Sequence, residues 1–263
     1  MAHPLPRVAL LLVALTTPAA AAPRAAPATK PDGARAVTAR ERALTAQIQE
    51  ADRALAADPQ NAGAYQQRGA ARFRLGHIAE SIADFDKYLE LRPGEKPEHW
   101  QRGIALYYAG RYEDGAKQFE LHRTVNPEDV ENAAWHYLCV ARAEVAGGAE
   151  TKKAVEKARG LLIPTKADRR VPMMNVQALF AGKGTPEDVL AAARAGKPGE
   201  EELKDRLFYA HLYIGLWHEA AGQGDEAKKH IGLAANDYAR DHYMGDVARV
   251  HAAMHAAAAG KKQ

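Results

Sequence analysis

Two histidines near the C-terminus have a spacing that could support metal chemistry. His251 and His255 are four residues apart, so on a helix they would share one face and could ligate the same ion. The metalloprotease pattern H-E-x-x-H needs a Glu directly after the first His, and Ala252 stands there. His218 precedes a Glu but has no second His four residues later. We therefore expect no metal and no cofactor, and we predict a solvated face for His251 and His255.

The nucleophiles available for covalent catalysis are few. Ser81 is the only serine and Cys139 the only cysteine, so a serine or cysteine nucleophile would have to be one of these two. Cys139 lies between apolar residues, where a thiol is expected to be buried and inert. A single thiol forms no intramolecular disulfide and no zinc site built on two or more cysteines. Packing alone is expected to hold the fold, and we do not expect an enzyme.

Composition narrows the class of protein. The chain has 263 residues, 47% of them hydrophobic, 26% charged and 7% aromatic, which is typical of a globular protein. Alanine is the most frequent of the hydrophobic residues, which favours closely packed helices. The formal net charge of +3 is too small to neutralise many phosphates. We expect an all-α fold and no nucleic-acid partner.

A 34-residue repeat organises the first half of the chain. When residues 62–95 are overlaid on residues 96–129, seven positions are identical. They are Gln67/Gln101, Arg68/Arg102, Gly69/Gly103, Ala71/Ala105, Gly76/Gly110, Phe85/Phe119 and Pro93/Pro127. Another step of 34 residues back from Pro93 reaches Pro59, so the period holds across three successive repeat ends.

The identical residues fall where pairs of helices need them. Gly69 and Gly103 lie in the middle of the first helix, where a missing side chain lets the second helix approach closely. Gly76 and Gly110 end that helix as left-handed caps. Ser81 faces Gly69 at a small-residue position, which makes it a packing residue.

This pattern resembles the tetratricopeptide repeat (TPR). The matching residues are Tyr65, Gly69, Gly76, Ile78, Ser81, Phe85 and Pro93, then His99, Gly103, Gly110, Tyr112, Gly115, Phe119 and Pro127. Arg68, Arg72 and Arg102 depart from it, because the family has apolar residues there. The resemblance implies a right-handed α-solenoid of helix-turn-helix repeats with a C-terminal capping helix.

The rest of the chain continues less regularly. Thr185-Pro186-Glu187-Asp188 predicts a helix start, with Thr185 as N-cap. In the last repeat, Gly215 stands at the close-packing position, Gly222 at the cap position and Ala227 at the small-residue position that faces Gly215. We divide the helical region 38–263 into repeats at 62–95 and 96–129, a degenerate repeat at 130–163, irregular helices at 164–207, a repeat at 208–241 and a capping helix at 241–259.

Residues 99–111 and 208–225 are similar in order and spacing to the bacterial family of new lipoprotein I. The resemblance implies an all-helical, often dimeric adaptor that presents cell-wall hydrolases to a partner protease. That family is anchored to the outer membrane through a lipidated cysteine, and this chain has no cysteine directly after its N-terminal apolar run.

The N-terminus predicts export. Arg7 precedes an apolar run at residues 8–15, and small residues at 19–22 offer a cleavage site. We expect a signal peptide at 1–21, a flexible linker at 22–37, and a periplasmic or extracellular protein with no membrane anchor after cleavage.

In TPR proteins the first helix of each pair lines a concave groove, and the resemblance places seven residues of this chain there. They are Gln66, Phe73, Arg74, Trp100, Ile104, Tyr107 and Tyr108. Exposed aromatics beside an arginine are typical of recognition surfaces, so we expect a scaffold that binds protein or peptide clients in this groove. Alternatively, the aromatics fill space between helix pairs. The competing functions are an envelope enzyme with a carboxylate or His site in 164–207, and a glycan-binding module.

Overall fold

The computed structural model describes the backbone of residues 38–260 and the side chains of residues 38–256. The predicted signal peptide (1–21) and linker (22–37) lie outside the described residues. Within this range the chain forms twelve α-helices and no β-strand, which confirms the all-α prediction. The helices are α1 (Ala39–Ala57), α2 (Ala62–Arg74), α3 (Ile78–Leu91), α4 (Trp100–Tyr108), α5 (Tyr112–His122), α6 (Val130–Ala146), α7 (Thr151–Gly160), α8 (Met173–Phe180), α9 (Pro186–Arg194), α10 (Glu200–Ala220), α11 (Gly224–Gly232) and α12 (Tyr243–Gly260).

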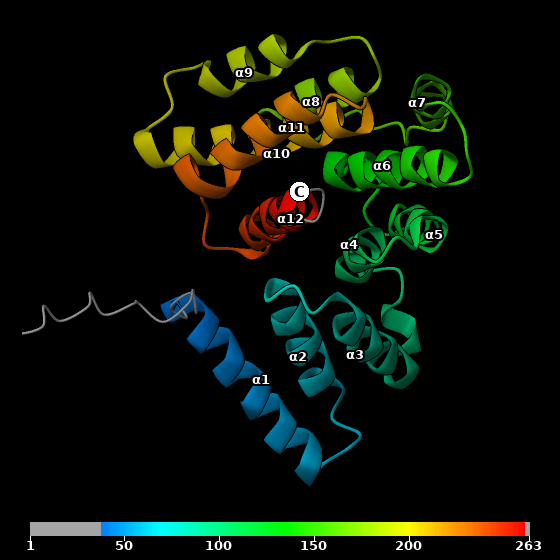
Figure 1. Ribbon diagram of the computed structural model, residues 1–263, viewed down its shortest axis with the longest axis vertical. Coiled ribbons are helices and arrows are strands. Elements are labelled where there is room, and N and C mark those ends of the chain that lie inside the picture. The colour runs from blue at the N-terminus through cyan, green and yellow to red at the C-terminus, as the bar shows by residue number, and fades with distance from the viewer. Residues whose placement is uncertain (1–37, 261–263) are drawn as a thin grey trace, which may run out of the picture. The chain divides into compact units, whose positions relative to one another are not determined.

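Helices adjacent in sequence pack against each other in pairs. Helices α2 and α3, α4 and α5, α6 and α7, and α10 and α11 form such pairs, and α3 meets α4 as α5 meets α6. Figure 1 shows the pairs following one another from α1 to α11. Each pair contributes an apolar face that its neighbour covers, so the core is continuous from α2 to α12.

The predicted packing glycines hold the paired helices close together. A Cβ atom built on Gly69 would lie 2.8 Å from the ring of Phe85, and one on Gly103 would lie 2.7 Å from Phe119. Both rings are fully buried. The Ser81 hydroxyl donates a 2.7 Å hydrogen bond to the Gly69 carbonyl oxygen, as expected for a packing residue. No larger side chain fits at either glycine without displacing an aromatic ring.

The same geometry recurs in the last pair. A Cβ atom on Gly215 would lie 2.8 Å from Ile231 Cγ1. Gly76, Gly110 and Gly222 have φ angles of +81°, +73° and +75°, so each ends its helix in the left-handed conformation as predicted.

Arginines stand where the repeat pattern that the sequence resembles has apolar residues, and each of them is paired with a carboxylate. Arg68 and Arg72 both donate to the carboxylate of Asp84, whose side chain is only 3% exposed. Arg102 pairs with Asp86 at 2.6 Å. These ion pairs connect α3 to its neighbours α2 and α4, so charged contacts contribute to the packing of these three helices.

The second half of the chain departs from the regular repeat. Thr185 caps α9 with a reciprocal capping box, as its sequence predicts. Helix α10 begins at Glu200, eight residues before the predicted repeat start at 208. Helix α11 continues into a π-helical turn at Leu233–Asp237, which redirects the chain toward α12.

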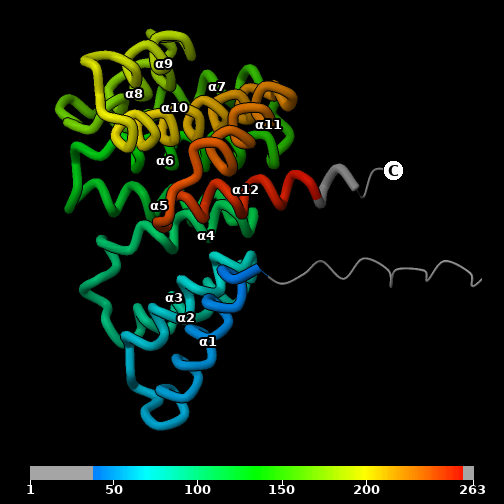
Figure 2. The backbone as a smooth tube through the Cα atoms, turned by 90° about the vertical axis from the view of Figure 1, so that its left-hand side faces the viewer, coloured from blue at the N-terminus to red at the C-terminus, as the bar shows by residue number. Residues whose placement is uncertain are grey.

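Helix α12 contacts both the last helix pair and the first part of the described chain. It contacts α11 and the π-helical turn, and it also contacts α2 near the other end of the chain. Figures 1 and 2 show it running through the space between α2 and α10. The predicted capping helix at 241–259 matches the residues of α12, but its contact with α2 was not predicted. Among residues 38–260, none of the helices combines the length and apolar character needed to cross a membrane.

Candidate functional site

Helix α12 covers the residues that the repeat pattern places in the groove. The Tyr243 ring stacks on Phe73 of α2 with centroids 5.3 Å apart and meets Trp100 of α4 edge-on at 5.1 Å. Further along, the Tyr108 hydroxyl and His251 Nδ1 are 3.0 Å apart and share a hydrogen bond. We call the surface of α2 and α4 formed by Phe73, Trp100 and Tyr108 the inner face. Its predicted groove is filled in part by the chain's own last helix.

A buried carboxylate anchors α12 to this position. Asp246 is 1% exposed and accepts hydrogen bonds from three arginines. Arg74 Nε of α2 lies 2.6 Å from its Oδ2, Arg249 Nη1 of α12 lies 3.0 Å from its Oδ1, and Arg40 of α1 also donates to it. Since Arg40 and Arg74 lie more than 170 residues before Asp246, this cluster closes a long-range contact.

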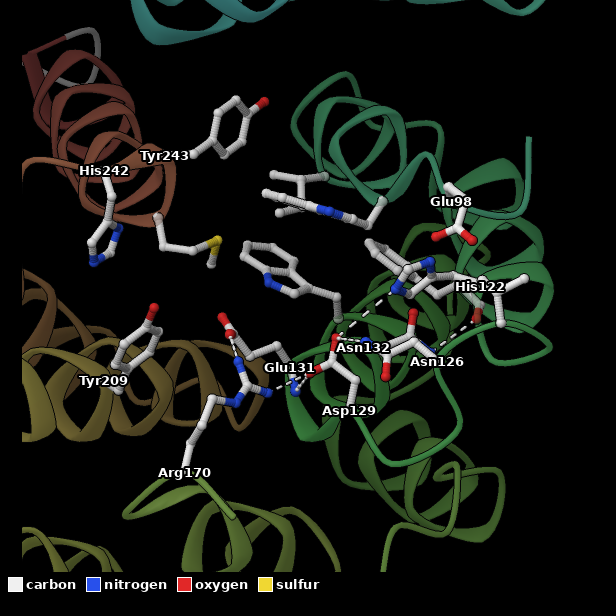
Figure 3. A pocket seen from close by; sticks show the side chains of 16 residues that line it. Glu98, His122, Asn126, Asp129, Glu131, Asn132, Arg170, Tyr209, His242 and Tyr243 are labelled. Atoms are coloured by element: carbon white, nitrogen blue, oxygen red, sulfur yellow. Dashed lines mark hydrogen bonds and ion pairs between the residues drawn. The ribbon is translucent and has the colours of Figure 1, made fainter. Parts of the chain in front are cut away.

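Beside the first turn of α12 lies a cavity of about 560 Å³, which we call the Trp100 cavity (Figure 3). Its apolar wall includes Trp100 and Ile104 of α4 and Trp135 of α6. Tyr209 of α10 and Tyr243 of α12 also line it, and the Tyr243 ring contacts Trp100. Helices from both halves of the chain therefore build it, and its volume suits a side chain or a small ligand.

Several polar atoms at this cavity have no hydrogen-bond partner among the described residues. They are Asn132 Oδ1, Trp135 Nε1, His242 Nε2 and the Tyr243 hydroxyl. Asn132 is 3% exposed and Trp135 is 1% exposed, and leaving such groups unpaired costs free energy. The set includes an obligatory donor, the indole N–H, and an obligatory acceptor, the amide oxygen. These atoms are themselves buried, so a ligand in the cavity would reach them only if the side chains turn toward it.

One side of the Trp100 cavity is charged. Arg170, from the segment between α7 and α8, lies 2.6 Å from carboxylate oxygens of Asp129 and Asp168 and also donates to Glu131. Figure 3 shows its guanidinium group between Glu131 and Asp129. The Tyr213 hydroxyl donates to Glu131 Oε2 at 2.7 Å. Burial raises the pKa of Glu131 to about 6, and the Arg170 charge opposes the rise.

A second, smaller cavity of about 210 Å³ lies toward the other end of α12, and we call it the Glu219 cavity. Tyr107 and Tyr108 line it. Glu219 of α10 lies 3.0 Å from His251 Nε2 and 3.4 Å from His255 Nε2. Burial opposes ionisation of this carboxylate, but the two histidines hold the pKa of Glu219 well below its usual value.

The seven predicted groove residues do not line one common groove: four of them line the two cavities, and three lie elsewhere. Trp100 and Ile104 line the Trp100 cavity, and Tyr107 and Tyr108 line the Glu219 cavity. Phe73 is fully buried beneath Tyr243, and Arg74 pairs with Asp246. Gln66 bonds to Gln101 at 2.5 Å and to His99 at 2.7 Å.

Burial corrects the idea of an open aromatic groove at three of these positions. Phe73, Ile104 and Tyr107 are 0%, 1% and 5% exposed. For Phe73 and Tyr107 the space-filling alternative describes the packing, because Tyr107 meets Trp135 and Tyr112 edge-on. Ile104 is buried as well, yet it forms part of a cavity wall.

The residues that complete the Trp100 cavity from later in the chain were not predicted from the sequence. Trp135, Arg170, Tyr209 and Tyr243 come from four separate segments. The only available signal was their type, since aromatic residues and arginine are enriched at recognition surfaces. Nothing in the 34-residue period places them beside Trp100.

The other chemical groups singled out from the sequence have structural surroundings. Cys139 is fully buried, and burial raises the pKa of its thiol. The prediction of a solvated face is wrong for His251, which is 2% exposed and lies between Tyr108 of α4 and Glu219 of α10. Between residues 38 and 256, two groups bring potential metal ligands together: Glu219 with His251 and His255, and His218 with Glu226 and His230.

Comparison with models of known protein families finds no family that matches this chain. The resemblance to tetratricopeptide repeats thus rests on the residues quoted above.

Proposed function

We propose that the protein is an exported scaffold of the tetratricopeptide-repeat type, a right-handed α-solenoid that holds a segment of a client protein in the Trp100 cavity. The observation that carries this proposal is the cavity itself, about 560 Å³ in volume, with an aromatic wall and polar atoms that lack partners among the described residues. Cavities of this size bind small ligands or single anchor side chains.

A peptide satisfies both parts of the cavity. An apolar client side chain would pack against Trp100, Ile104 and Trp135, since rigid aromatics bury area at a low entropy cost. The backbone of a bound client would bring donors and acceptors beside Asn132 and Trp135, whose Oδ1 and Nε1 atoms have no partner among the described residues. The Arg170 cluster at the rim favours a polar residue next to the anchor.

Export is part of the same proposal. The basic residue and the apolar run at the N-terminus predict a signal peptide at 1–21, and the mature protein would act in the periplasm or outside the cell. Its clients would then be envelope proteins, in assembly or in proteolysis. Since the new lipoprotein I family is often dimeric, the proposal includes a homodimer as a functional form of the scaffold.

Peptide selection tests the proposal. Peptides selected from a random library on the immobilised protein should bind Trp100→Ala at least about tenfold more weakly, because the substitution removes an anchor wall. Trp217→Ala is the matched control, since Trp217 is also a partly buried tryptophan but lines neither cavity. Equal binding by both variants would contradict the proposal, and so would a library that yields no peptide.

One observation favours a second candidate, an envelope enzyme. The pKa of Glu131 is raised to about 6, which suits general acid-base catalysis near neutral pH, and Arg170 from the predicted segment 164–207 contacts it. Hydrolysis of cell-wall sacculi, assayed with and without chelator and abolished in Glu131→Gln, would establish the enzyme instead. Cosedimentation with intact sacculi without turnover would indicate a glycan-binding module.

A further inference from the structure

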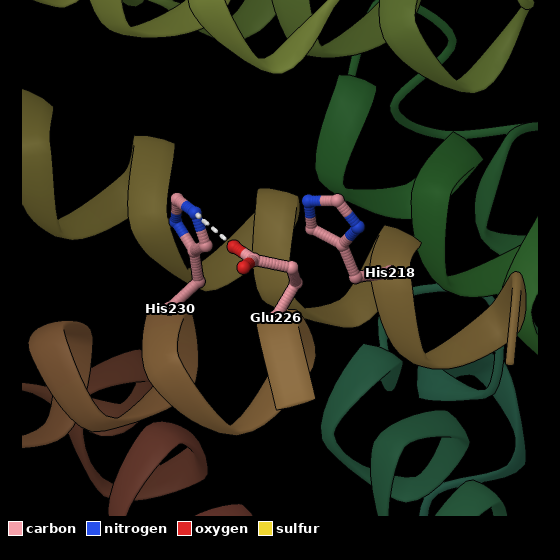
Figure 4. A group of neighbouring side chains, drawn as sticks. All are labelled: His218, Glu226 and His230. Carbon is pink, nitrogen blue, oxygen red and sulfur yellow. Dashed lines mark ion pairs between the residues drawn. The ribbon is translucent and has the colours of Figure 1, made fainter. Parts of the chain in front are cut away.

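Three potential metal ligands converge at the end of α10, outside both cavities. His218 lies in the last turn of α10, and Glu226 and His230 lie on α11. Because Glu226 and His230 are four residues apart on one helix, they share a face, and the turn between the helices brings His218 beside them. One ligand atom from each residue lies within 4.8 Å of the other two. Figure 4 shows the two imidazole rings on either side of the Glu226 carboxylate.

Neighbouring side chains fix the imidazole of His218. Its Nδ1 lies 2.5 Å from Oε1 of Gln223. A carboxamide oxygen only accepts hydrogen bonds, so Nδ1 carries the proton and Nε2 keeps its lone pair. A ligating histidine in a metal site usually donates its other ring N–H to such an acceptor.

His230 is held in a similar way. Its Nδ1 lies 2.9 Å from Nδ1 of His211, and His211 stacks on the ring of Tyr238 with centroids 5.1 Å apart. The His230 side chain is only 8% exposed. When His230 donates from Nδ1 to His211, its Nε2 lone pair is free on the side of Glu226.

We propose that His218, Glu226 and His230 bind a divalent transition metal ion, with Zn²⁺ as the preferred ion and at least one coordination position open to water. Two imidazole nitrogens and one carboxylate are a ligand set of zinc sites that keep an open position. Imidazole ligands disfavour Mg²⁺ and Ca²⁺, which prefer oxygen. This proposal is independent of the peptide-binding function.

Lys229 competes with the metal ion for the Glu226 carboxylate. Lys229 Nζ lies 3.0 Å from Glu226 Oε2, but its side chain is 61% exposed and can turn into solvent. The second convergent group, Glu219 with His251 and His255, is less suited to a cation. Arg142 Nη1 lies 3.8 Å from Glu219 Oε1, so a fixed positive charge already stands beside that carboxylate.

Titration calorimetry with ZnCl₂ on the purified, untagged protein tests the proposal. We expect one Zn²⁺ per chain. His218→Gln and Glu226→Gln should each weaken binding at least about tenfold, and Gln223→Ala should weaken it about tenfold by releasing the His218 ring. Lys229→Met should tighten binding. Both ligand residues are partly or fully accessible, so folding should be retained, and circular dichroism checks it.

His255→Gln is the matched control from the second group, and it should bind Zn²⁺ like the unmodified protein. Absence of Zn²⁺ binding would overturn the proposal. Binding that is lost in His255→Gln but kept in His218→Gln and Glu226→Gln would overturn it as well, because the ion would then sit at Glu219. Binding that is kept in all of the variants would also place the ion elsewhere.

Discussion

The two cavities beside α12 each contain a buried carboxylate, and their surroundings shift the two pKa values in opposite directions. Burial raises the pKa of Glu131 in the Trp100 cavity to about 6. In the Glu219 cavity burial also opposes ionisation, but His251 and His255 of α12 outweigh it and lower the pKa of Glu219. At the Glu219 cavity α12 therefore supplies the ion-pair partners of the carboxylate, whereas in the Trp100 cavity Arg170 comes from the segment between α7 and α8.

Both cavities exist only while α12 lies against the inner face. The substitution Asp246→Ala removes the carboxylate that holds α12 there. The substitution leaves three arginines without their shared buried partner. We expect a loss of about 3 kcal/mol in the free energy of unfolding, near the low end for a broken buried pair because the arginines are partly exposed. Urea denaturation followed by circular dichroism measures it.

Asp241→Ala is the matched control for Asp246→Ala. Asp241 also pairs with Arg40, but its side chain is 87% exposed, so its removal should leave the free energy of unfolding nearly unchanged. Equal losses in the two variants would show that Asp246 does not anchor the helix.

Helix α4 contributes residues to both cavities. A side chain added at Gly103 would push α4 away from α5 and so should change the packing at both cavities. In Gly103→Ala the new Cβ would lie 2.7 Å from the buried Phe119 ring. We expect a net destabilisation of about 1 to 2 kcal/mol, because overpacking exceeds the gain in helix propensity. Gly232→Ala has open space around its Cβ and should stabilise by up to about 1 kcal/mol. Thermal or urea unfolding of the two variants compares them, and the same sign in both would contradict the packing role.

The raised pKa of Glu131 predicts a pH-dependent stability difference. Its folded pKa of about 6 exceeds the usual 4.5, so the folded state favours the protonated carboxyl and loses stability as pH rises from 4.5 through 6. Glu131→Gln should therefore be more stable than the unmodified protein at pH 8, by up to about 2 kcal/mol. The difference should disappear near pH 4.5. A difference that is independent of pH would show that the carboxyl titrates normally.

At the Glu219 cavity the substitution His255→Gln should destabilise the protein rather than stabilise it, and the change in the free energy of unfolding should be smaller. The pKa of His255 is raised by its ion pair with Glu219, so its stabilisation is present in mild acid and is lost as pH rises through that pKa. The depressed pKa of Glu219 means that the carboxylate's share is lost only at lower pH. Since the His255 side chain is 42% exposed, His255→Gln should cost only about 0.5 kcal/mol near pH 6 and nothing near pH 9. Unfolding measured at both values tests this, and a loss that persists at pH 9 would contradict it.

The features of the fold that could be predicted from the sequence are those with local causes. Gly69, Gly103 and Gly215 marked the close helix contacts because a missing side chain in a helix costs stability unless a neighbour uses the space. Thr185 marked a helix start because its hydroxyl caps nearby backbone N–H groups. Each of these signals is contained within one helix pair.

The position of α12 had no such local signal. Its alanine-rich sequence predicts a helix, but the contact between Asp246 and Arg74 joins residues 172 positions apart. The candidate site shows the same division. Trp100 was found through the repeat, whereas Trp135 and Tyr243 join it only through the tertiary fold.

Hydrogen exchange with a selected peptide tests most directly whether the Trp100 cavity is the binding site. At saturating peptide, amide protection should increase in residues 98–104, 129–135 and 242–244, which line that cavity, and should stay unchanged in residues 251–255 beside Glu219. Protection confined to residues 251–255, or to α3 and α7 away from the cavity, would contradict the account.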